Sequence, residues 1–353
     1  METAKGCYII AEIGNNHCGS LDLCIKTIEE AHKCGASAVK LQKRCNNALF
    51  ADELFNQPYD HPNSYGATYG EHRQRLELSE EDFVQARRCA NDLGIDFLCT
   101  PFDEPSAVFL GDRLQLDGWK IASADLRNRR LFSVITRYLR DDSPLIISNG
   151  GYSLEETLDT VTHVLKYTQK VAALHCISSY PCLPKHVNLA AMVELQSHLP
   201  KSVVVGYSSH DNGTAIPLAA RVLGAQVIEK HFTLDRSFKG TDHAMSANPT
   251  MLRRLVKELN IIDESIGSKC KVREEHEVKP LFKMIKSPYA AGGLEAGHTI
   301  REEDFEFRVP FTGLDYADAC LLIGKRLKRD LQKGDKIVID HFEMACHEPS
   351  SCC

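Results

Sequence analysis

The chain has 353 residues, of which 43% are hydrophobic and 25% charged, a composition typical of a large globular protein. Its formal net charge of −6 and its lack of a long basic run argue against general nucleic-acid binding. No apolar stretch approaches the roughly 18–20 residues of a membrane span. Glu12 interrupts a very short N-terminal apolar run, which argues against a signal peptide. We therefore expect a cytoplasmic protein that binds neither nucleic acid nor membranes.

The 14 cysteines are scattered, and none of them forms a CxxC pair. Several lie in apolar runs, where a reduced thiol behaves as a small hydrophobic group. This pattern predicts free thiols in a reducing compartment. The final pair, Cys352 and Cys353, resembles a prenylation ending with nothing else to support it, so we interpret the last residues as a disordered tail.

Short apolar runs recur along the first 267 residues, and a helical pattern follows most of them. The runs are 7–13, 38–42, 96–101, 119–123, 145–149, 171–178, 203–210 and 226–233. Strands that alternate with helices indicate a parallel sheet covered by helices. Eight such units in about 250 residues predict a closed (β/α)8 barrel, which we place at residues 1–268.

The end of each apolar run carries polar, chemically capable residues. In a (β/α)8 barrel the carboxyl ends of all strands face one mouth, where active sites lie. Residues far apart in the sequence would therefore meet at one site, which predicts an enzyme. Residues 43–77 form a long polar excursion after the second run, and their aromatic and glycine residues indicate fixed turns and packing rather than a flexible loop.

The pattern changes near Gly267. Residues 269–285 are highly charged at their start and are interpreted as a linker. Beyond them Leu294-x-x-Gly297-x-x-Ile300 recurs as Leu331-x-x-Gly334-x-x-Ile337, with every matched position offset by 37. Two copies of a turn-plus-strand unit predict a small, pseudo-symmetric, β-rich domain at 286–345, followed by a disordered tail at 346–353. A domain of about 60 residues is marginal alone, so we expect it to dock on a barrel.

His210 and His231 end adjacent predicted strands, the seventh and eighth. Side chains in such positions reach one shared ion, and neutral imidazole is a ligand for divalent transition metals. A histidine alone is more often structural, but Glu12, Asp125 and Glu229 are expected at the same mouth. We predict a divalent metal ion on the two histidines, and neutral imidazole suits manganese, iron, cobalt or zinc.

One lysine and a set of hydroxyl groups are expected around the same mouth, a combination that suits a phosphate bound by many donors. They are Lys40, Thr100, Ser123, Ser148, Ser178 and Ser208. Serine and threonine at strand ends also cap backbone groups, so the argument rests on their coincidence. Lys120 lies inside its strand, where it either lines the barrel or forms an interior salt bridge. His175 is interpreted as structural.

Several motifs, in order, resemble one known family, the sialic acid synthases. They are Ala11-Glu12-Ile13-Gly14-Asn15-Asn16-His17-x-Gly19, Val39-Lys40-x-Gln42, Thr68-Tyr69-Gly70-Glu71-His72, Thr100-Pro101-Phe102, Lys120-Ile121-Ala122-Ser123, Tyr180-Pro181, Gly206-Tyr207-Ser208-x-His210, Glu229-Lys230-His231-Phe232 and Gly240-Thr241-Asp242-His243. The repeat resembles the C-terminal antifreeze-like (SAF) domain of that family. The resemblance implies a TIM barrel plus SAF domain, in a transferase that condenses phosphoenolpyruvate with an open-chain N-acyl hexosamine, usually N-acetylmannosamine, to a nine-carbon 2-keto acid.

The resemblance also implies roles for matched positions. His210 and His231 correspond to the metal ligands. Lys40, Thr100, Lys120, Ser123, Ser148, Ser178 and Ser208 are expected at phosphoenolpyruvate. Gln42, Tyr180 and Asp242 are expected at the sugar, with Arg308 as a substitute for a family arginine that Val309 replaces here. Glu12, Asp125 and Glu229 are the expected catalytic acids, with Glu12 as first choice to take the proton of the added water.

The identity of the sugar stays open for two reasons. Asp125 stands where bacterial members of the family often have Glu, and Val309 stands where many of them have Arg. The product is sialic acid, its 9-phosphate, or legionaminic or pseudaminic acid. Two other classes remain as alternatives: a Schiff-base aldolase with Lys40, Lys120 or Lys230 as nucleophile, and a non-catalytic sugar-binding protein. Related synthases exchange the C-terminal domain between subunits, so the resemblance implies a domain-swapped homodimer.

Overall fold

The computed structural model describes residues 6–343, and the chain divides between Gly267 and Ser268 into two compact units. The predicted disordered tail, 346–353, lies outside the described residues. The first unit contains all eight barrel strands, which pair in sequence order and close on themselves, as β1 also pairs with β8. The strands are β1 (Tyr8–Gly14), β2 (Ala38–Lys43), β3 (Asp96–Pro101), β4 (Gly118–Ile121), β5 (Leu145–Ser148), β6 (Val171–Cys176), β7 (Val204–Ser209) and β8 (Val227–His231).

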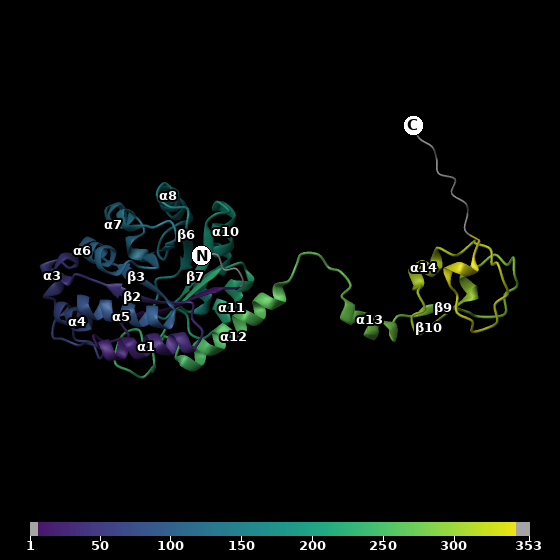
Figure 1. Ribbon diagram of the computed structural model, residues 1–353, viewed down its shortest axis with the longest axis horizontal. Coiled ribbons are helices and arrows are strands. Elements are labelled where there is room, and N and C mark those ends of the chain that lie inside the picture. Colours follow the sequence, from purple (N-terminus) through teal and green to yellow (C-terminus); the bar gives the residue numbers. More distant parts are fainter. Residues whose placement is uncertain (1–5, 344–353) are drawn as a thin grey trace, which may run out of the picture. The chain divides into compact units, whose positions relative to one another are not determined.

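Helices lie between the strands and surround the barrel (Figure 1). They are α1 (Leu21–Lys33), α2 (Asn46–Leu49), α3 (Asp52–Phe55), α4 (Tyr69–Leu76), α5 (Glu80–Leu93), α6 (Glu104–Phe109), α7 (Arg129–Ile135), α8 (Leu154–Val164), α9 (Pro184–Val187), α10 (Leu189–His198), α11 (Ala215–Val222) and α12 (Pro249–Ile266). The predicted (β/α)8 barrel is therefore confirmed. Five predicted runs extend one or two residues past the observed strands: 119–123, 145–149, 171–178, 203–210 and 226–233. After β4 the backbone bends at Ser123 into a short 3-10 turn, and β6 ends at Cys176.

The barrel buries two separate apolar layers. One lies between the strands and the helices and includes Ile9, Ala11 and Ile13 of β1. The other fills the inside of the barrel. It consists of Ile10, Ala38, Leu98, Ile146, Ala172, Leu174 and Val227. Because successive side chains of a strand point to opposite faces, Ile9 and Ile10 enter different layers.

The excursion after β2 has a packed structure, as its composition predicts. It contains the three helices α2, α3 and α4, and aromatic rings hold it together. Tyr59 packs against Tyr69 and His72, with ring centroids 5.5 and 4.8 Å apart, and Phe50 packs against Tyr69 at 5.3 Å. The segment is therefore a fixed wall beside the carboxyl end of β2.

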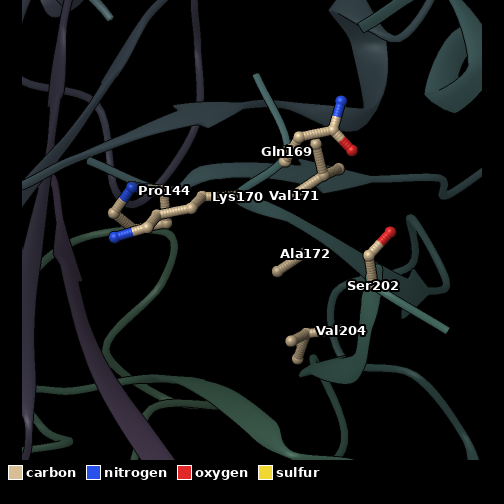
Figure 2. A pocket seen from close by; sticks show the side chains of 7 residues that line it. All are labelled: Pro144, Gln169, Lys170, Val171, Ala172, Ser202 and Val204. Atoms are coloured by element: carbon tan, nitrogen blue, oxygen red, sulfur yellow. The ribbon is translucent and has the colours of Figure 1, made fainter. Parts of the chain in front are cut away.

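A hollow of about 270 Å³ lies at the amino-terminal ends of β5, β6 and β7. Its lining residues are Pro144, Gln169, Lys170, Val171, Ala172, Ser202 and Val204 (Figure 2). Lys170 is the only charged residue among them. The hollow opens at the amino-terminal end of the barrel, where residues of this fold usually contribute to stability rather than catalysis. It lacks the mixture of acids, bases and donors that chemistry needs.

The second unit is built on an internal twofold repeat. It contains α13 (Glu275–Phe282), β9 (Ser287–Ala290), β10 (Phe305–Arg308) and α14 (Tyr316–Cys320). Leu294 and Leu331, equivalent positions of the repeat, exchange both backbone hydrogen bonds at 2.8 Å. The pair Ala290–Phe305 recurs, 37 residues on, as Leu327–Phe342. Residues 269–285, predicted as a linker, hold α13.

The repeat positions also explain the core of this unit. Leu294, Ile300, Leu331, Ile337 and Phe342 are buried in one cluster. Gly297 and Gly334 have φ of +85° and +87°, which a side chain would strain, so the glycine of each copy is required by its turn.

Within residues 6–343, none of the helices has the length and apolar character needed to cross a bilayer. All 11 cysteines of this described range are free thiols.

Candidate active site

The inside of the barrel changes from apolar to polar along six of its eight strands. The polar residue lies two positions after a residue of the interior cluster, so both point inward. Glu12 follows Ile10, Lys40 follows Ala38, and Glu229 follows Val227 in this way. Thr100, Ser148 and Cys176 have the same relation to Leu98, Ile146 and Leu174. The alternation of the strands therefore builds a polar chamber on an apolar floor.

The chamber is a cavity of about 300 Å³ at the carboxyl ends of the strands. Its lining residues are Glu12, Lys40, Gln42, Thr100, Phe102, Lys120, Ala122, Ser123, Ala124, Ser148, Cys176, Ser178, Tyr180, Ser208, His210, Glu229 and His231. Every strand of the barrel contributes through its end or the residues just beyond it. This is the convergence that the strand ends predict.

Lys40 is the electrostatic centre of the cavity. Its Nζ lies 2.6 Å from Glu12 Oε2 and 3.7 Å from Glu229 Oε1, and it donates a hydrogen bond to Thr100 Oγ1 at 3.2 Å. Burial alone would lower the pKa of Lys40, but the two carboxylates outweigh it and raise that pKa above its usual value. Lys40 is therefore a fixed positive charge.

Lys120 and several hydroxyl groups also line the cavity. Lys120 Nζ donates to Ser148 Oγ at 2.7 Å, and burial lowers the pKa of Lys120. The backbone N–H of Gly150 donates to Ser123 Oγ at 2.9 Å. A Cβ at Gly150 would lie 2.4 Å from Ser178 Oγ and 2.9 Å from Ser123 Oγ. The backbone at Gly150 therefore approaches these hydroxyls more closely than a residue with a side chain could. Together these groups form a concave set of hydrogen-bond donors, here called the cradle.

Glu229 is an ionised acid in the same cavity. Burial raises its pKa, but Lys120 and Lys40 together outweigh burial and hold the pKa well below its usual range. Ser208 Oγ donates to Glu229 Oε1 at 3.1 Å, while Oε2 has no hydrogen-bond partner among the described residues. The cavity thus pairs two lysines with two carboxylates.

His210 and His231 face each other with ring centroids 5.5 Å apart. His210 Nδ1 lies 2.7 Å from the carbonyl oxygen of Ile177, which can only accept a hydrogen bond. The proton of a neutral His210 must therefore be on Nδ1, which leaves Nε2 as a free lone pair. Burial, and then His231, lowers the pKa of His210 to about 4, so the ring is neutral at pH 7.

The donor set suits a divalent metal in an open site. His231 Nδ1 is buried with no hydrogen-bond partner in the described chain, and Asp242 Oδ2 lies 3.8 Å away. Within residues 6–343, no cluster of three or more His, Cys, Asp or Glu side chains forms a closed metal site. A metal here would therefore rest on two imidazoles and take its other ligands from oxygen atoms of water or substrate.

The pattern of the NeuB family matches residues 27–271, which is most of the barrel. The chain belongs to the NeuB family. It is a transferase of the sialic acid synthase type, a phosphoenolpyruvate-dependent enzyme that makes nonulosonic acids.

Relatives of this NeuB protein span nearly its whole length. The N-acetylneuraminate-9-phosphate synthase of Homo sapiens is 34% identical over 334 residues, which cover 94% of this chain and 91% of the human one. The N,N'-diacetyllegionaminic acid synthase of Legionella pneumophila is also 34% identical, covering 96% and 95%. The crystal structure of the N-acetylneuraminic acid synthetase of Leptospira borgpetersenii, in complex with citrate, superposes with a TM-score of 0.68 at 30% identity and covers 78% of this chain and 90% of its own.

Three residues that the sequence predicts for the NeuB site lie outside the cavity lining. Asp125 ends the turn after β4 and accepts a hydrogen bond from Asn128 Nδ2 at 2.9 Å. Asp242 lies beside His231, and Arg308 lies in the second unit, beside Glu306. The other predicted site residues all line the cavity.

Four lining residues were not predicted: Phe102, Ala122, Ala124 and Cys176. Phe102 directly follows β3, inside a motif that the resemblance had already marked. Cys176 resembles a core residue in sequence, but its position two residues after Leu174 points it into the cavity, where its Sγ lies 3.8 Å from His210 Nδ1. The inward alternation of β6 is the signal that would have identified it.

Proposed function

We propose that this enzyme condenses phosphoenolpyruvate with an open-chain N-acyl hexosamine, N-acetylmannosamine being our first choice, to give a nine-carbon 2-keto acid and phosphate. The observation that carries the proposal is a single cavity that combines two lysines, two buried carboxylates, a cradle of hydroxyls and two histidines. Each group has a task in that reaction. Related synthases are named for several different nonulosonic acids, so the 9-phosphate, legionaminic and pseudaminic products are alternatives.

Phosphoenolpyruvate would bind between Lys40 and Lys120. Both ammonium groups, with the hydroxyls of Thr100, Ser123, Ser148, Ser178 and Ser208, offer donors to its carboxylate and phosphate oxygens. The N–H groups near Gly150 add to this cradle. The carboxylates of Glu12 and Glu229 would repel this anion. It must therefore bind on the side of the lysines that faces away from these two acids.

The reaction then needs one C–C bond and one C–O cleavage. The methylene carbon of phosphoenolpyruvate attacks the aldehyde carbon of the open-chain sugar, which leaves positive charge on the neighbouring enol carbon. Water adds to that carbon and loses one proton, and the aldehyde oxygen gains one proton to become a hydroxyl group. The tetrahedral intermediate then expels phosphate with its bridging oxygen, which produces the 2-keto group.

Glu12 is the residue proposed to take the proton of the added water. It is buried at 1% exposure and lies beside Lys40, which holds it in place. A positioned proton acceptor of this kind contributes about 100- to 10,000-fold. Glu229, held ionised by the two lysines, would stabilise the positive charge that develops on the enol carbon.

His210 and His231 would hold a divalent metal, manganese as first choice and magnesium or cobalt as alternatives. When bound, the ion supplies Lewis acidity to the sugar aldehyde. The chain itself keeps the His210 imidazole neutral and oriented, with its Nδ1 proton directed at the Ile177 carbonyl, and Asp242 lies beside His231. Tyr180, whose ring centroid lies 4.1 Å from that of His210, would close the sugar side together with Gln42 and Asp242.

The second unit is proposed to be a SAF domain that covers the barrel of a partner subunit in a homodimer. The SAF assignment rests on the repeated sequence motif, and the reciprocal hydrogen bonds between Leu294 and Leu331 agree with that repeat. Arg308 would then face the sugar bound in the other subunit. A cytoplasmic location is part of the same proposal, because the described cysteines are free thiols.

Release of inorganic phosphate tests the proposal against its rivals. The synthase releases phosphate from phosphoenolpyruvate only when the hexosamine is present. An imine-forming aldolase, for which Lys120 with its lowered pKa is the best candidate, would instead be trapped covalently by borohydride. A sugar-binding protein would do neither, so borohydride trapping or a lack of phosphate release would reject the synthase.

A further inference from the structure

Arg44 lies directly behind two residues that line the cavity. It follows the end of β2, and its side chain is only 6% exposed. Its guanidinium carbon lies 3.9 Å from the ring centroid of Phe102, and its Nη2 donates to Gln42 Oε1 at 2.6 Å. Arg44 does not line the cavity itself, so it can act on the reaction only through these neighbours.

The hydrogen bonds of Gln42 admit one orientation of its amide. A guanidinium can only donate, and an ionised carboxylate can only accept. Gln42 Oε1 faces Arg44, and Gln42 Nε2 donates to Glu12 Oε1 at 2.6 Å. A flipped amide would place its NH2 group against the guanidinium and its oxygen against the carboxylate. Both contacts would then be repulsive.

Glu12 is consequently held at both oxygens. Gln42 occupies Oε1, and Lys40 Nζ lies 2.6 Å from Oε2. Because Arg44 orients Gln42, the order Arg44–Gln42–Glu12–Lys40 forms a continuous polar chain from the outer wall to the centre of the cavity.

Arg44 is itself fixed by contacts outside the cavity. Its Nη1 lies 3.4 Å from Asn15 Oδ1 and 3.8 Å from Glu77 Oε1, and its backbone N–H donates to Glu77 Oε2 at 3.3 Å. Burial, and then the charge of Arg73, lowers the pKa of Arg44 to about 10, which still leaves it charged at pH 7. Contacts to three separate segments give this side chain little freedom to move.

We propose that Arg44 is a positioning residue, which locks the Gln42 amide and through it holds the Glu12 carboxylate in place for proton transfer. The inference rests on the proposed function, because Glu12 acts there as the acceptor of the proton. It assigns Gln42 a second task besides facing the sugar. Loss of Arg44 would remove one of the two hydrogen bonds that hold the Gln42 amide and leave that side chain free to move relative to Glu12.

A double-mutant cycle between Arg44 and Gln42 tests this role. Arg44→Met should lower kcat by about tenfold or more, because small misplacement of a catalytic group is costly. The KM for phosphoenolpyruvate and the affinity for Mn, measured by calorimetry, should change by less than about threefold. In a Gln42→Leu background, Arg44→Met should have no further effect, since Arg44 acts through that amide. Arg44→Lys, which keeps a donor, should recover part of kcat.

The matched control is Arg88→Met, an exposed arginine of α5, which should behave as the wild type. If Arg44→Met fails to fold, the same cycle with Arg44→Lys decides the question. Additive effects of the Arg44 and Gln42 changes, or a loss confined to KM, would overturn the positioning role alone. A folded wild type that releases no phosphate from phosphoenolpyruvate with any hexosamine would overturn the proposed function, and this inference with it.

Discussion

Lys40 Nζ and Glu12 Oε2 lie 2.6 Å apart inside the barrel mouth, both almost fully buried. The free enzyme therefore keeps the lysine charged and occupied before any substrate arrives. The ion pair fixes the direction of the Lys40 side chain. An anionic substrate therefore binds to a lysine that is already paired with Glu12. The pair also links the group proposed to bind phosphoenolpyruvate to the group proposed to take a proton.

Lys40→Ala should strongly weaken the use of phosphoenolpyruvate. Each lost charge-assisted contact costs about 1.5–3 kcal/mol, roughly a 10- to 150-fold fall in kcat/KM. The change also leaves Glu12 buried without its cation, and breaking a buried pair costs about 3–5 kcal/mol of stability. Steady-state kinetics and urea unfolding measure the two effects separately.

The double variant Lys40→Ala with Glu12→Gln is the control for this prediction. It removes the stranded charge, so stability should partly return while activity stays low. An unchanged kcat/KM for phosphoenolpyruvate in Lys40→Ala would remove Lys40 from the binding site.

Metal removal should abolish turnover, because the His210 and His231 pair is proposed to hold the ion beside the aldehyde. Chelation should stop phosphate release, and Mn, Mg or Co should restore it. His210→Ala and His231→Ala should each weaken Mn binding in calorimetry, whereas His198→Gln, an exposed histidine of α10, should not. Full turnover by rigorously metal-free enzyme would contradict this prediction.

Much of the barrel could be predicted from the sequence, because along its strands an apolar residue and the polar residue that follows it are spaced two positions apart. Ile10 and Glu12, or Val227 and Glu229, read as apolar then polar at a spacing of two, which gives both the strand and the direction of its side chains. Parallel strands then bring these ends together without further information. The position of Ser148, two residues after Ile146, follows in the same way, whereas the sequence leaves open whether Lys120 lines the barrel or forms an interior salt bridge.

Contacts that depend on loop conformation could not be predicted. Arg44 sits just past a strand, and nothing in its local pattern shows that it folds back over Phe102 toward Gln42. The sequence predicts Asp125 at the mouth, and the 3-10 turn that begins at Ser123 places Ser123 and Ala124 in the cavity lining and turns the Asp125 carboxylate toward Asn128. Turn geometry decides both cases, and turns carry little periodic signal.

Stability should fall in mild acid, in part because of His17. This histidine is buried, and its Nδ1 accepts a hydrogen bond from Gly19 N–H at 3.1 Å, which a second ring proton would break. Burial lowers the pKa of His17 from 6.5 to about 4. Between these values the unfolded chain binds the extra proton, so the free energy of unfolding should decrease as the pH falls, by up to about 1.4 kcal/mol per pH unit.

Urea unfolding of the wild type and of His17→Gln between pH 7 and pH 4 measures this contribution. The variant should be less stable at pH 7 and lose less stability on acidification, because one proton-linked group has gone. Identical slopes for the two proteins over this range would show that His17 does not take part in the acid sensitivity.

Mixed dimers should reveal whether the second unit serves a partner's barrel. A subunit with His231→Ala has an inactive barrel but an intact second unit. A subunit truncated before Pro288 has an intact barrel but no second unit. Activity should partly return when the two are combined, as the intact unit of the first covers the intact barrel of the second. No recovery from demonstrated mixed dimers, with the truncated barrel folded, would mean that the unit acts within its own chain.

The central claim is that phosphoenolpyruvate condenses with a hexosamine by cleavage of its C–O bond. The most direct measurement uses phosphoenolpyruvate labelled with ¹⁸O at the bridging oxygen, a panel of N-acyl hexosamines and their 6-phosphates, and mass spectrometry of both products in the presence of Mn. The account predicts a nine-carbon 2-keto acid, or its 9-phosphate, without label, together with phosphate that carries the ¹⁸O. Label retained in the sugar acid, or a product without the three added carbons, would contradict it.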